Sequence, residues 1–408
     1  MSAGLTWPNN DYGTEMLSFL THARIRQQVR DQPMDQGLKS RLIEVLLERL
    51  NPIRYKIPDD FLEYTHFKRV IHGINRQASP GYPYLLQYTT NEQMFCIGED
   101  GKIPEYICKE YYDMIMERIQ DETYDPIRVF IKPEAITKKK YYQHRERLIS
   151  SVSVIDQLID HLLFDEKQNI MIGNWDKIPP KVGWTPIVGG WKLVPQVNVQ
   201  AADKSAWDWT MQGWIVEILL EITLRLCDNP TNNWKNLVCR RYKQLFSDAI
   251  FILSNGCMYK QKDKGLMKSG SVMTIMDNSL AQYVMHMRIV LELGLEEGIL
   301  WSMGDDTLQT RQPKEYFEKL AQYCILKQVD TISEFAGMRF KGMQVTPSYL
   351  SKHAYKLLHL DPELKDEVAL AYYLLYHRSS NKGKIAKVLS YLREVPTKEW
   401  LDLVYDGC

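Results

Sequence analysis

The triplet Gly304-Asp305-Asp306, set between two short apolar stretches, constrains the fold of this chain more than any other feature of its sequence. Residues 299–303 and 307–310 each suit a short strand, and the turn residues between them predict a β-hairpin. Two adjacent carboxylates at a hairpin tip repel each other, and Gly304 permits backbone angles that other residues resist. A solvated turn explains the triplet as well as a functional site does. The triplet therefore predicts a hairpin, and predicts a site only in combination with other acidic residues.

A second pair of acidic residues, Asp203 and Asp208, lies where a predicted strand leads into a predicted helix. The alternating pattern of the strand covers residues 195–201 and leads to Asp203 at the strand's end, and the helix covers residues 207–226. A helix N-cap explains this segment without any function. Two Mg²⁺ ions about 4 Å apart, however, need carboxylates from different elements, because hard cations select oxygen ligands. We therefore expect Asp203 to lie beside the hairpin tip.

The third element is a Ser- and Gly-containing loop, residues 268–271, that enters a predicted helix over residues 272–293. Thr274 and Asn278 are four positions apart and share one face of that helix, opposite its apolar stripe. That face should project into a cleft, where Asn278 and an acid near Asp203 could read a ribose 2′-hydroxyl. A capped surface helix is the alternative explanation.

The most basic stretch of the chain runs from Arg128 to Arg147. A solvated loop is the usual meaning of such a run. Beside a cluster of carboxylates, the same run would line the channel through which a nucleoside triphosphate enters, because its cations neutralise phosphate. The basic residues are Arg128, Lys132, Lys138, Lys139, Lys140, Arg145 and Arg147, against Glu134 and Glu146.

The overall composition is that of a soluble globular protein, with 45% hydrophobic and 25% charged residues. The 51 basic and 51 acidic residues give zero net charge, which does not favour nucleic-acid binding but leaves room for a local basic groove. The 7 cysteines are scattered without a C-x-x-C pair, which favours reduced thiols over disulfides or a zinc site. Charges interrupt the apolar segments, so no membrane-spanning helix is expected.

Strands and helices alternate in the middle of the chain, whereas both ends are mostly helical. This order predicts an α+β fold with a sheet-based core between helical lobes. Further helices are expected within residues 14–50, at 155–171 and 314–323, and from about residue 350 onward. Further strands are expected at 128–132, 249–253 and 325–329, with a polar loop over 254–271 and a second hairpin over 335–345.

These elements, in their order along the chain, resemble motifs F, A, B and C of positive-strand RNA virus polymerases. The order is the basic run, D-x₄-D from Asp203 to Asp208, S-G-x₃-T-x₃-N from Ser269 to Asn278, and Gly-Asp-Asp. The Ser-Pro-Gly-Tyr-Pro-Tyr loop over residues 79–84 is similar to motif G, which contacts template and product strands. More narrowly, residues 147–158, 207–209, 268–271 and 303–306 resemble the sobemovirus and polerovirus branch.

The resemblance implies a right-hand polymerase fold of fingers, palm and thumb, with an antiparallel palm sheet flanked by helices. Residues 1–195 would form the fingers with an N-terminal extension. Residues 196–348 would form the palm, with an inserted fingers segment near 226–270, and residues 349–408 the thumb. The implied function is RNA-templated synthesis of RNA from ribonucleoside triphosphates, replicating and transcribing a positive-strand RNA virus genome. Its cofactor would be two Mg²⁺ ions, for which Mn²⁺ can substitute.

The resemblance also implies a role for each matching residue. The catalytic and metal-binding residues would be Asp203, Asp305 and Asp306, with Asp306 assisting. The triphosphate would be bound by Lys132, Arg145 and Arg147, with Glu134 orienting a basic neighbour. Ribose would be selected by Asp208, Thr274 and Asn278. A mobile loop would be formed by Ser269 and Gly270. RNA would be contacted by Ser79, Gly81, Tyr82, Lys138, Lys139 and Lys140. Lys327 would be the general acid toward pyrophosphate, with Lys341 as its rival, and residues 335–340 resemble the primer-grip hairpin.

The implied partners are template and product RNA, ribonucleoside triphosphates and other viral replication proteins, and the resemblance allows a protein-linked primer. The implied location is the host cytoplasm, at replication complexes on membranes that the protein reaches through partners. Whether synthesis starts de novo or from a protein-linked primer stays open.

Two alternative functions compete with this one. A reverse transcriptase shares the same chemistry, but Asn278 and Asp208 suit a 2′-hydroxyl. A catalytically inactive RNA-binding protein would also keep the fold. The intact carboxylates at 203, 305 and 306 argue against it, because crowding unneeded charges costs stability.

Overall fold

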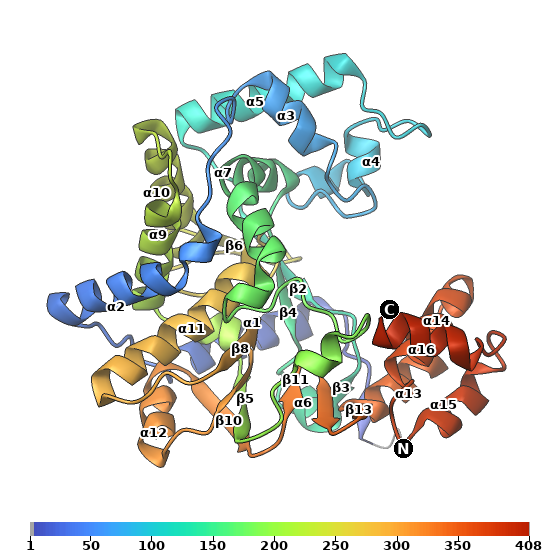
Figure 1. The fold of residues 1–408 in the computed structure, drawn as a ribbon. Coiled ribbons are helices and arrows are strands. Elements are labelled where there is room, and N and C mark those ends of the chain that lie inside the picture. The colour runs from blue at the N-terminus through green and yellow to red at the C-terminus, as the bar shows by residue number, and fades with distance from the viewer. Residues whose placement is uncertain (1–3, 408) are drawn as a thin grey trace.

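A four-stranded antiparallel sheet, the central sheet, is built from the middle of the chain and carries the acidic residues. The computed structural model describes residues 4–407. Its central sheet has the strand order β10-β5-β9-β8, and every neighbouring pair is antiparallel. The helices α11 and α12 contact this sheet, and Figure 1 shows both beside it. The elements are β5 (Val199–Ser205), β8 (Leu300–Met303), β9 (Asp306–Thr310), β10 (Ile325–Asp330), α11 (Thr274–Leu293) and α12 (Lys314–Tyr323).

The predicted hairpin around the Gly-Asp-Asp triplet is confirmed. Strands β8 and β9 pair from Leu300 with Gln309 to Met303 with Asp306, so the turn consists of residues 304 and 305. Gly304 has a φ of 62°, in the left-handed region that glycine adopts without strain. The predictions of a helix over 272–293 and of a strand over 325–329 are likewise confirmed by α11 and β10.

Two predictions next to this sheet were wrong in their boundaries. The strand expected at 195–201 is β5, which begins only at Val199, where pairing with Thr310 starts. The helix expected over 207–226 is broken into α8 (Trp207–Thr210) and α9 (Gly213–Leu226). The break follows from tertiary hydrogen bonding: the carbonyl of Met211 accepts the N–H of Leu266 at 3.1 Å instead of continuing the helix.

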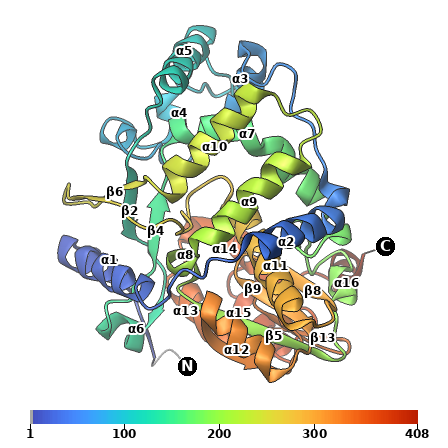
Figure 2. The ribbon, with the colours of Figure 1, turned by 90° about the vertical axis from the view of Figure 1, so that its left-hand side faces the viewer.

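A second sheet lies between helices of the N-terminal half. Its order is β4-β2-β6-β7, and β2 and β6 are parallel, so the segment near 226–270 is joined to residues 127–151. Figure 2 shows this sheet between α7 above and α1 below. The loop expected over 254–271 contains a strand, β7, because its residues pair with β6 around a turn at Gly256. The strands are β2 (Ile127–Ile131), β4 (Leu148–Ser151), β6 (Ile250–Ile252) and β7 (Met258–Lys260).

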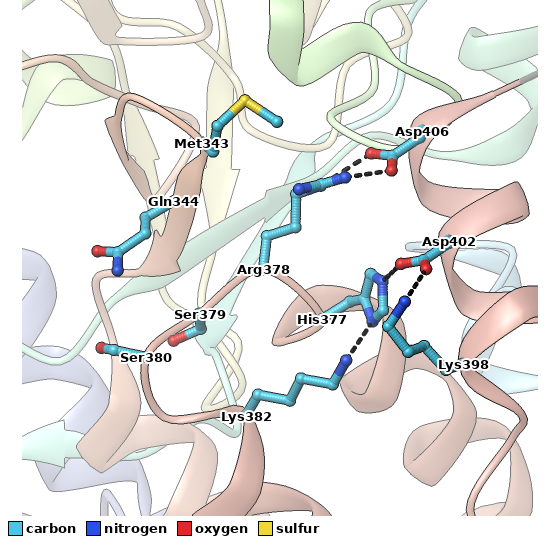
Figure 3. A pocket seen from close by; sticks show the side chains of 10 residues that line it. All are labelled: Met343, Gln344, His377, Arg378, Ser379, Ser380, Lys382, Lys398, Asp402 and Asp406. Carbon is cyan, nitrogen blue, oxygen red and sulfur yellow. Dashed lines mark hydrogen bonds and ion pairs between the residues drawn. The ribbon is translucent and has the colours of Figure 1, made fainter.

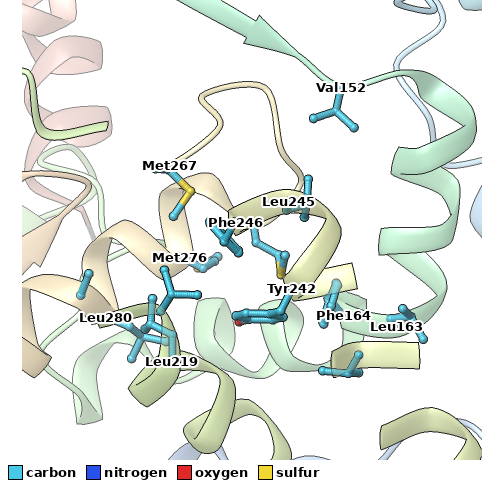
Figure 4. Packing of buried hydrophobic residues seen from close by; sticks show 14 of the residues in the cluster. Val152, Leu163, Phe164, Leu219, Tyr242, Leu245, Phe246, Met267, Met276 and Leu280 are labelled. Atoms are coloured by element: carbon cyan, nitrogen blue, oxygen red, sulfur yellow. The ribbon is translucent and has the colours of Figure 1, made fainter. Parts of the chain in front are cut away.

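One continuous apolar core joins the helices of this half to α11. Figure 4 shows side chains from α7, α9, α10 and α11 meeting in it. The two helices expected within residues 14–50 are confirmed, and each begins at an aspartate, Asp11 or Asp35, whose carboxylate accepts an N–H of the first turn. The helices are α1 (Tyr12–Arg26), α2 (Gln36–Arg49), α3 (Tyr64–Ile71), α4 (Asn91–Met94), α5 (Glu105–Asp121), α7 (Val154–Gly173) and α10 (Asn232–Phe246).

The C-terminal part consists of a small sheet followed by helices, as expected. The predicted second hairpin is formed by β12 and β13 and is extended by β11. Four α-helices then gather on one side of the molecule (Figure 1). The elements are β11 (Glu334–Phe335), β12 (Met338–Lys341), β13 (Gln344–Pro347), α13 (Leu350–Leu358), α14 (Lys365–Leu375), α15 (Lys382–Leu389) and α16 (Lys398–Asp406).

The last helix, α16, is fastened to the irregular segment that precedes β5. The N–H groups of Val188 and Gly189 donate to carbonyls at the end of α16, at 3.0 and 2.9 Å. Beside this seam lies a polar cavity of about 490 Å³ (Figure 3). Two of the cations that line it are paired with carboxylates of α16: Arg378 with Asp406, and Lys398 with Asp402 at 2.9 Å. The cavity therefore belongs to the fastening of α16.

Candidate active site

The three predicted acidic ligands lie on neighbouring strands of the central sheet. Asp203 is in β5, Asp305 is in the hairpin turn, and Asp306 is the first residue of the adjacent strand β9. Burial, together with the negative charges of Asp305 and Asp203, raises the pKa of Asp306 to about 6, although the nearby Lys204 ammonium lowers it. A carboxyl that resists ionisation beside two others marks a place where a cation would be stabilising.

A lysine occupies part of this acidic cluster. The ammonium group of Lys327, on β10, forms an ion pair with the carboxylate of Asp203. The rival candidate Lys341 lies in a different sheet, paired in register with Gln344. Within residues 4–407, no three Asp, Glu, His or Cys side chains stand close enough together to hold a metal ion in this arrangement. Metal binding by the three aspartates would thus require their side chains to converge and Lys327 to release Asp203.

The donor set nevertheless suits a hard divalent cation. All three groups are carboxylates on two adjacent strands and one turn, and oxygen ligands are those that Mg²⁺ prefers. Burial and the neighbouring negative charges both raise the pKa of Asp306, and a bound cation would offset both effects.

The predicted sugar-selecting residues are in direct contact. The side-chain amide of Asn278 donates to the carboxylate of Asp208 at 3.1 Å, and its oxygen accepts the indole N–H of Trp207 at 2.8 Å. Burial raises the pKa of Asp208 to about 6, while the hydrogen bond from Asn278 works in the opposite direction. Both polar ends of Asn278 are thereby fixed, and the amide holds Asp208 in one orientation.

The loop before α11 is anchored on β4. Ser269 accepts the N–H of Ser150 through its hydroxyl at 2.9 Å, and the N–H of Gly270 donates to the carbonyl of Ser150 at 2.9 Å. A Cβ on Gly270 would lie 2.6 Å from that carbonyl oxygen, so no side chain fits there. The hydroxyl of Thr274 lies 2.9 Å from the carbonyl of Ser271 and so holds the loop, not Asp208.

The basic residues expected to grip a triphosphate are held from two sides. Glu134 pairs with Lys132 at 3.0 Å and lies 3.9 Å from Arg147. Arg145 donates to the hydroxyl of Ser205, the last residue of β5, at 2.9 Å. Glu134 thus holds Lys132 and Arg147, and β5, the strand that carries Asp203, holds Arg145.

Three further lysines lie on a helix that the sequence had not suggested. Lys138, Lys139 and Lys140 begin α6 (Lys138–Tyr142), where Thr137 accepts an N–H of the first turn. All three are exposed. Although the Lys140 side chain is exposed, the surrounding protein partly desolvates its ammonium and lowers its pKa, and the nearby charges of Lys352, Arg145 and Lys327 lower that pKa further. Lys352, on α13, therefore joins the basic cluster from the C-terminal helices.

The loop expected to contact RNA lies against the start of α7. The carbonyl of Pro80 accepts the N–H of Val154 at 2.8 Å, and a Cβ on Gly81 would lie 2.9 Å from the Cα of Ser153. Ser79 accepts the N–H of Gly81 at 3.3 Å. Tyr82 lines a cavity of about 590 Å³. Tyr12 and Arg128 line the same cavity, whose lining does not include Asp203, Asp305 or Asp306.

Two residues that the sequence analysis had not singled out hold the hairpin tip. The hydroxyl of Ser279, next to Asn278 on α11, accepts the N–H of Gly304 at 2.9 Å. The ammonium of Lys204 contacts Asp305 and Thr307 from inside the molecule. The burial of Lys204 could have been predicted from the sequence, because strand alternation places it on the face opposite Asp203, where apolar residues are expected.

Comparisons with known proteins identify a family for most of the chain. A family model described as viral RNA-dependent RNA polymerase matches residues 25–324. The replicase polyprotein P2AB of Southern cowpea mosaic virus is 28% identical over 290 residues, which are 65% of this chain and 29% of that protein. Protein P1-P2 of a Potato leafroll virus strain is 25% identical over 420 residues, covering 91% of this chain and 38% of that protein. The chain thus spans about a third of these relatives' length.

Two further relatives are closer to this chain in length. The RNA-directed RNA polymerase of Mushroom bacilliform virus is 24% identical over 352 residues, covering 78% of this chain and 84% of that protein. Among solved structures, a Sicinivirus 3Dpol RNA-dependent RNA polymerase matches with a TM-score of 0.69 at 18% identity. That match covers 89% of this chain and 82% of the other, and it establishes a shared fold.

Proposed function

The chain belongs to the family of viral RNA-dependent RNA polymerases, and from this premise we propose that it synthesises RNA on an RNA template from ribonucleoside triphosphates. The predicted likeness to sobemovirus and polerovirus proteins and the right-hand polymerase fold are confirmed. The single observation that carries the proposal is the position of Asp203 on the strand beside the Asp305-Asp306 hairpin, with the Asn278–Asp208 pair on the neighbouring helices. The task of the enzyme would be to replicate and transcribe a positive-strand RNA virus genome.

Each group near the carboxylates has a part in the proposed reaction. Two Mg²⁺ ions held by Asp203, Asp305 and Asp306 would lower the pKa of the attacking 3′-hydroxyl and stabilise the leaving pyrophosphate. Lys132, Arg145 and Arg147 bind the triphosphate oxygens, with Glu134 holding the first and last of these cations in place. Lys327, once released from Asp203, donates a proton to the pyrophosphate.

The Asn278–Asp208 pair is proposed to recognise the ribose 2′-hydroxyl. Asp208→Ala and Asn278→Ala should each lower the preference for ribonucleotides over deoxyribonucleotides by about tenfold to 100-fold, because a hydrogen bond to a charged group contributes about 1.5–3 kcal/mol. Single-nucleotide incorporation with the two kinds of substrate measures this ratio. Trp207→Phe, which removes only the donor that holds Asn278, should give a smaller loss. Unchanged selectivity in both alanine variants would refute the assignment.

Gly270 tests whether the loop before α11 must stay close to β4. Gly270→Ala places a methyl group 2.6 Å from the carbonyl oxygen of Ser150, so the loop has to move. Because small displacements of positioning groups are costly, we expect nucleotide incorporation to slow by about tenfold to 100-fold. The control is Gly383→Ala, where a Cβ meets nothing within 4 Å. Equal rates in the two variants would show that the loop position does not matter.

The decisive experiment is primer extension on a short RNA template, with and without a primer, in Mg²⁺ or Mn²⁺. Incorporation that needs both the template and the divalent cation supports the proposal, and incorporation without a primer indicates de novo initiation. Use of a DNA template with deoxyribonucleotides at equal rates would instead support a reverse transcriptase. No product with any combination would contradict both.

The proposed partners are template and product RNA, other viral replication proteins and, where initiation needs one, a protein-linked primer. In the part of the chain that the structure describes, no helix has the length and apolar character needed to cross a membrane. We propose that the protein acts in the host cytoplasm, at membrane-associated replication complexes that it reaches through partners.

A further inference from the structure

Lys204 has an unusual position directly behind the acidic cluster. It follows Asp203 in β5, so its side chain leaves the opposite face of the strand, and only 6% of its surface is exposed. Its ammonium lies 3.1 Å from the carbonyl oxygen of Asp305 and 3.0 Å from the hydroxyl of Thr307. Both acceptors belong to the Gly-Asp-Asp hairpin, one in the turn and one in β9.

Stability alone does not explain this lysine. Taking an ammonium out of water costs several kcal/mol unless excellent contacts compensate. Among the residues that the structure describes, no carboxylate lies within 4.0 Å of the Lys204 ammonium. An apolar side chain would fill the same space without that cost. The contacts to Asp305 and Thr307 are therefore the distinguishing property of Lys204.

The main-chain pairing between β5 and β9 shows what these contacts accomplish. The ladder runs from Val199 with Thr310 to Ala202 with Thr307 and stops there. Beyond Thr307, no β5–β9 backbone pair holds the hairpin tip against β5, although Asp203 and Asp305 lie in that region. The side chain of Lys204 bridges this gap. On the other side of the tip, Ser279 binds the N–H of Gly304 at 2.9 Å.

We propose that Lys204 is a positioning residue that clamps the tip of the catalytic hairpin to β5. The clamp sets the distance between Asp203 and Asp305 before nucleotide and cation bind, and Ser279 fixes the tip from α11. The link to catalysis rests on the proposed polymerase function, whereas the clamp itself is a property of the hairpin that can be measured without any activity.

Hydrogen–deuterium exchange on the metal-free protein in chelator tests the clamp directly. Lys204→Met keeps the length and most of the volume of the side chain but removes the donors. We expect peptides covering residues 300–310 to exchange about tenfold faster than in the wild type, because hydrogen bonds from a charged donor are lost. Peptides from α7 and α14 should keep wild-type rates.

Two further variants sharpen the test. Thr307→Val removes one acceptor of Lys204, together with the hydrogen bond that the Thr307 hydroxyl donates to the carbonyl of Ala202 at 3.3 Å, but it leaves the contact to the Asp305 carbonyl, so its hairpin should exchange at an intermediate rate. Lys192→Met removes another lysine that donates to an aspartate carbonyl, that of Asp406 at 2.8 Å. It should loosen α16 without affecting the hairpin.

Kinetics separate a clamp from general support of the fold. Lys204→Met should lower kcat by about 100-fold, as expected for catalytic groups displaced by about 1 Å, while KM for the nucleotide and RNA affinity stay at wild-type values. Wild-type exchange of the hairpin in both Lys204→Met and Thr307→Val would overturn the proposal, as would a uniform rise in exchange across the chain. If the wild type makes no RNA, the polymerase proposal fails, and the exchange experiment still decides the clamp.

Discussion

Asp305→Ala is expected to abolish RNA synthesis while leaving the affinity for RNA largely intact. Asp305 supplies a carboxylate at the hairpin tip, and cations at such a site contribute several kcal/mol of transition-state stabilisation. A loss of about 5 kcal/mol corresponds to a fall in kcat of between three and four orders of magnitude. RNA affinity should change little, because phosphate contacts by basic residues dominate it. Primer extension measures the first effect, and filter binding at fixed salt concentration measures the second.

Two other aspartate variants make this result specific. Asp306→Ala should reduce synthesis less than Asp305→Ala, because Asp306 is the more buried of the pair and burial raises its pKa. Asp330→Ala removes an aspartate from the far end of β10 and should leave the rate near that of the wild type. Synthesis that survives in Asp305→Ala would contradict the metal assignment.

The elements that carry these aspartates could be predicted because local signals determine them. The hairpin follows from turn residues between two apolar runs, and α11 follows from its apolar stripe. Glycine and paired aspartates also predict the turn between β8 and β9, because this signal does not depend on the rest of the chain. The order of the acidic, polar and basic segments then sufficed to indicate the family.

What could not be predicted depends on contacts between distant segments. The break between α8 and α9 exists because Met211 pairs with Leu266, 55 positions along the chain. The strand β7 forms only because β6 offers it an edge. The role of Lys204 depends on the turn at Asp305: strand alternation places this lysine on the buried face of β5 but does not tell which groups it contacts there.

A buried network behind the active site was also invisible in the sequence. Asp277 precedes Asn278 on α11, and its side chain is fully buried in the core. Its carboxylate pairs with Lys167 of α7 at 2.8 Å and accepts the hydroxyl of Tyr242 of α10 at 2.9 Å. Figure 4 shows Tyr242 among the apolar side chains of this core. Lys167 also donates to Thr223 of α9 at 2.9 Å, so four helices meet at this point.

Asp277→Ala should therefore lower the free energy of unfolding by about 3–5 kcal/mol, because it leaves the ammonium of Lys167 buried without a counter-charge. The side chains of Asp277 and Lys167 are each only 1% exposed, so water cannot replace the lost carboxylate. Urea unfolding followed by tryptophan fluorescence measures the change.

Replacing both partners with apolar residues, Lys167→Met with Asp277→Leu, should restore most of the stability, since no charge then stays buried. Glu318→Ala breaks an exposed ion pair with Lys314 and should have little effect. If Asp277→Ala proved as stable as Glu318→Ala, the network would not be what holds α11, and with it Asn278, against the other three helices.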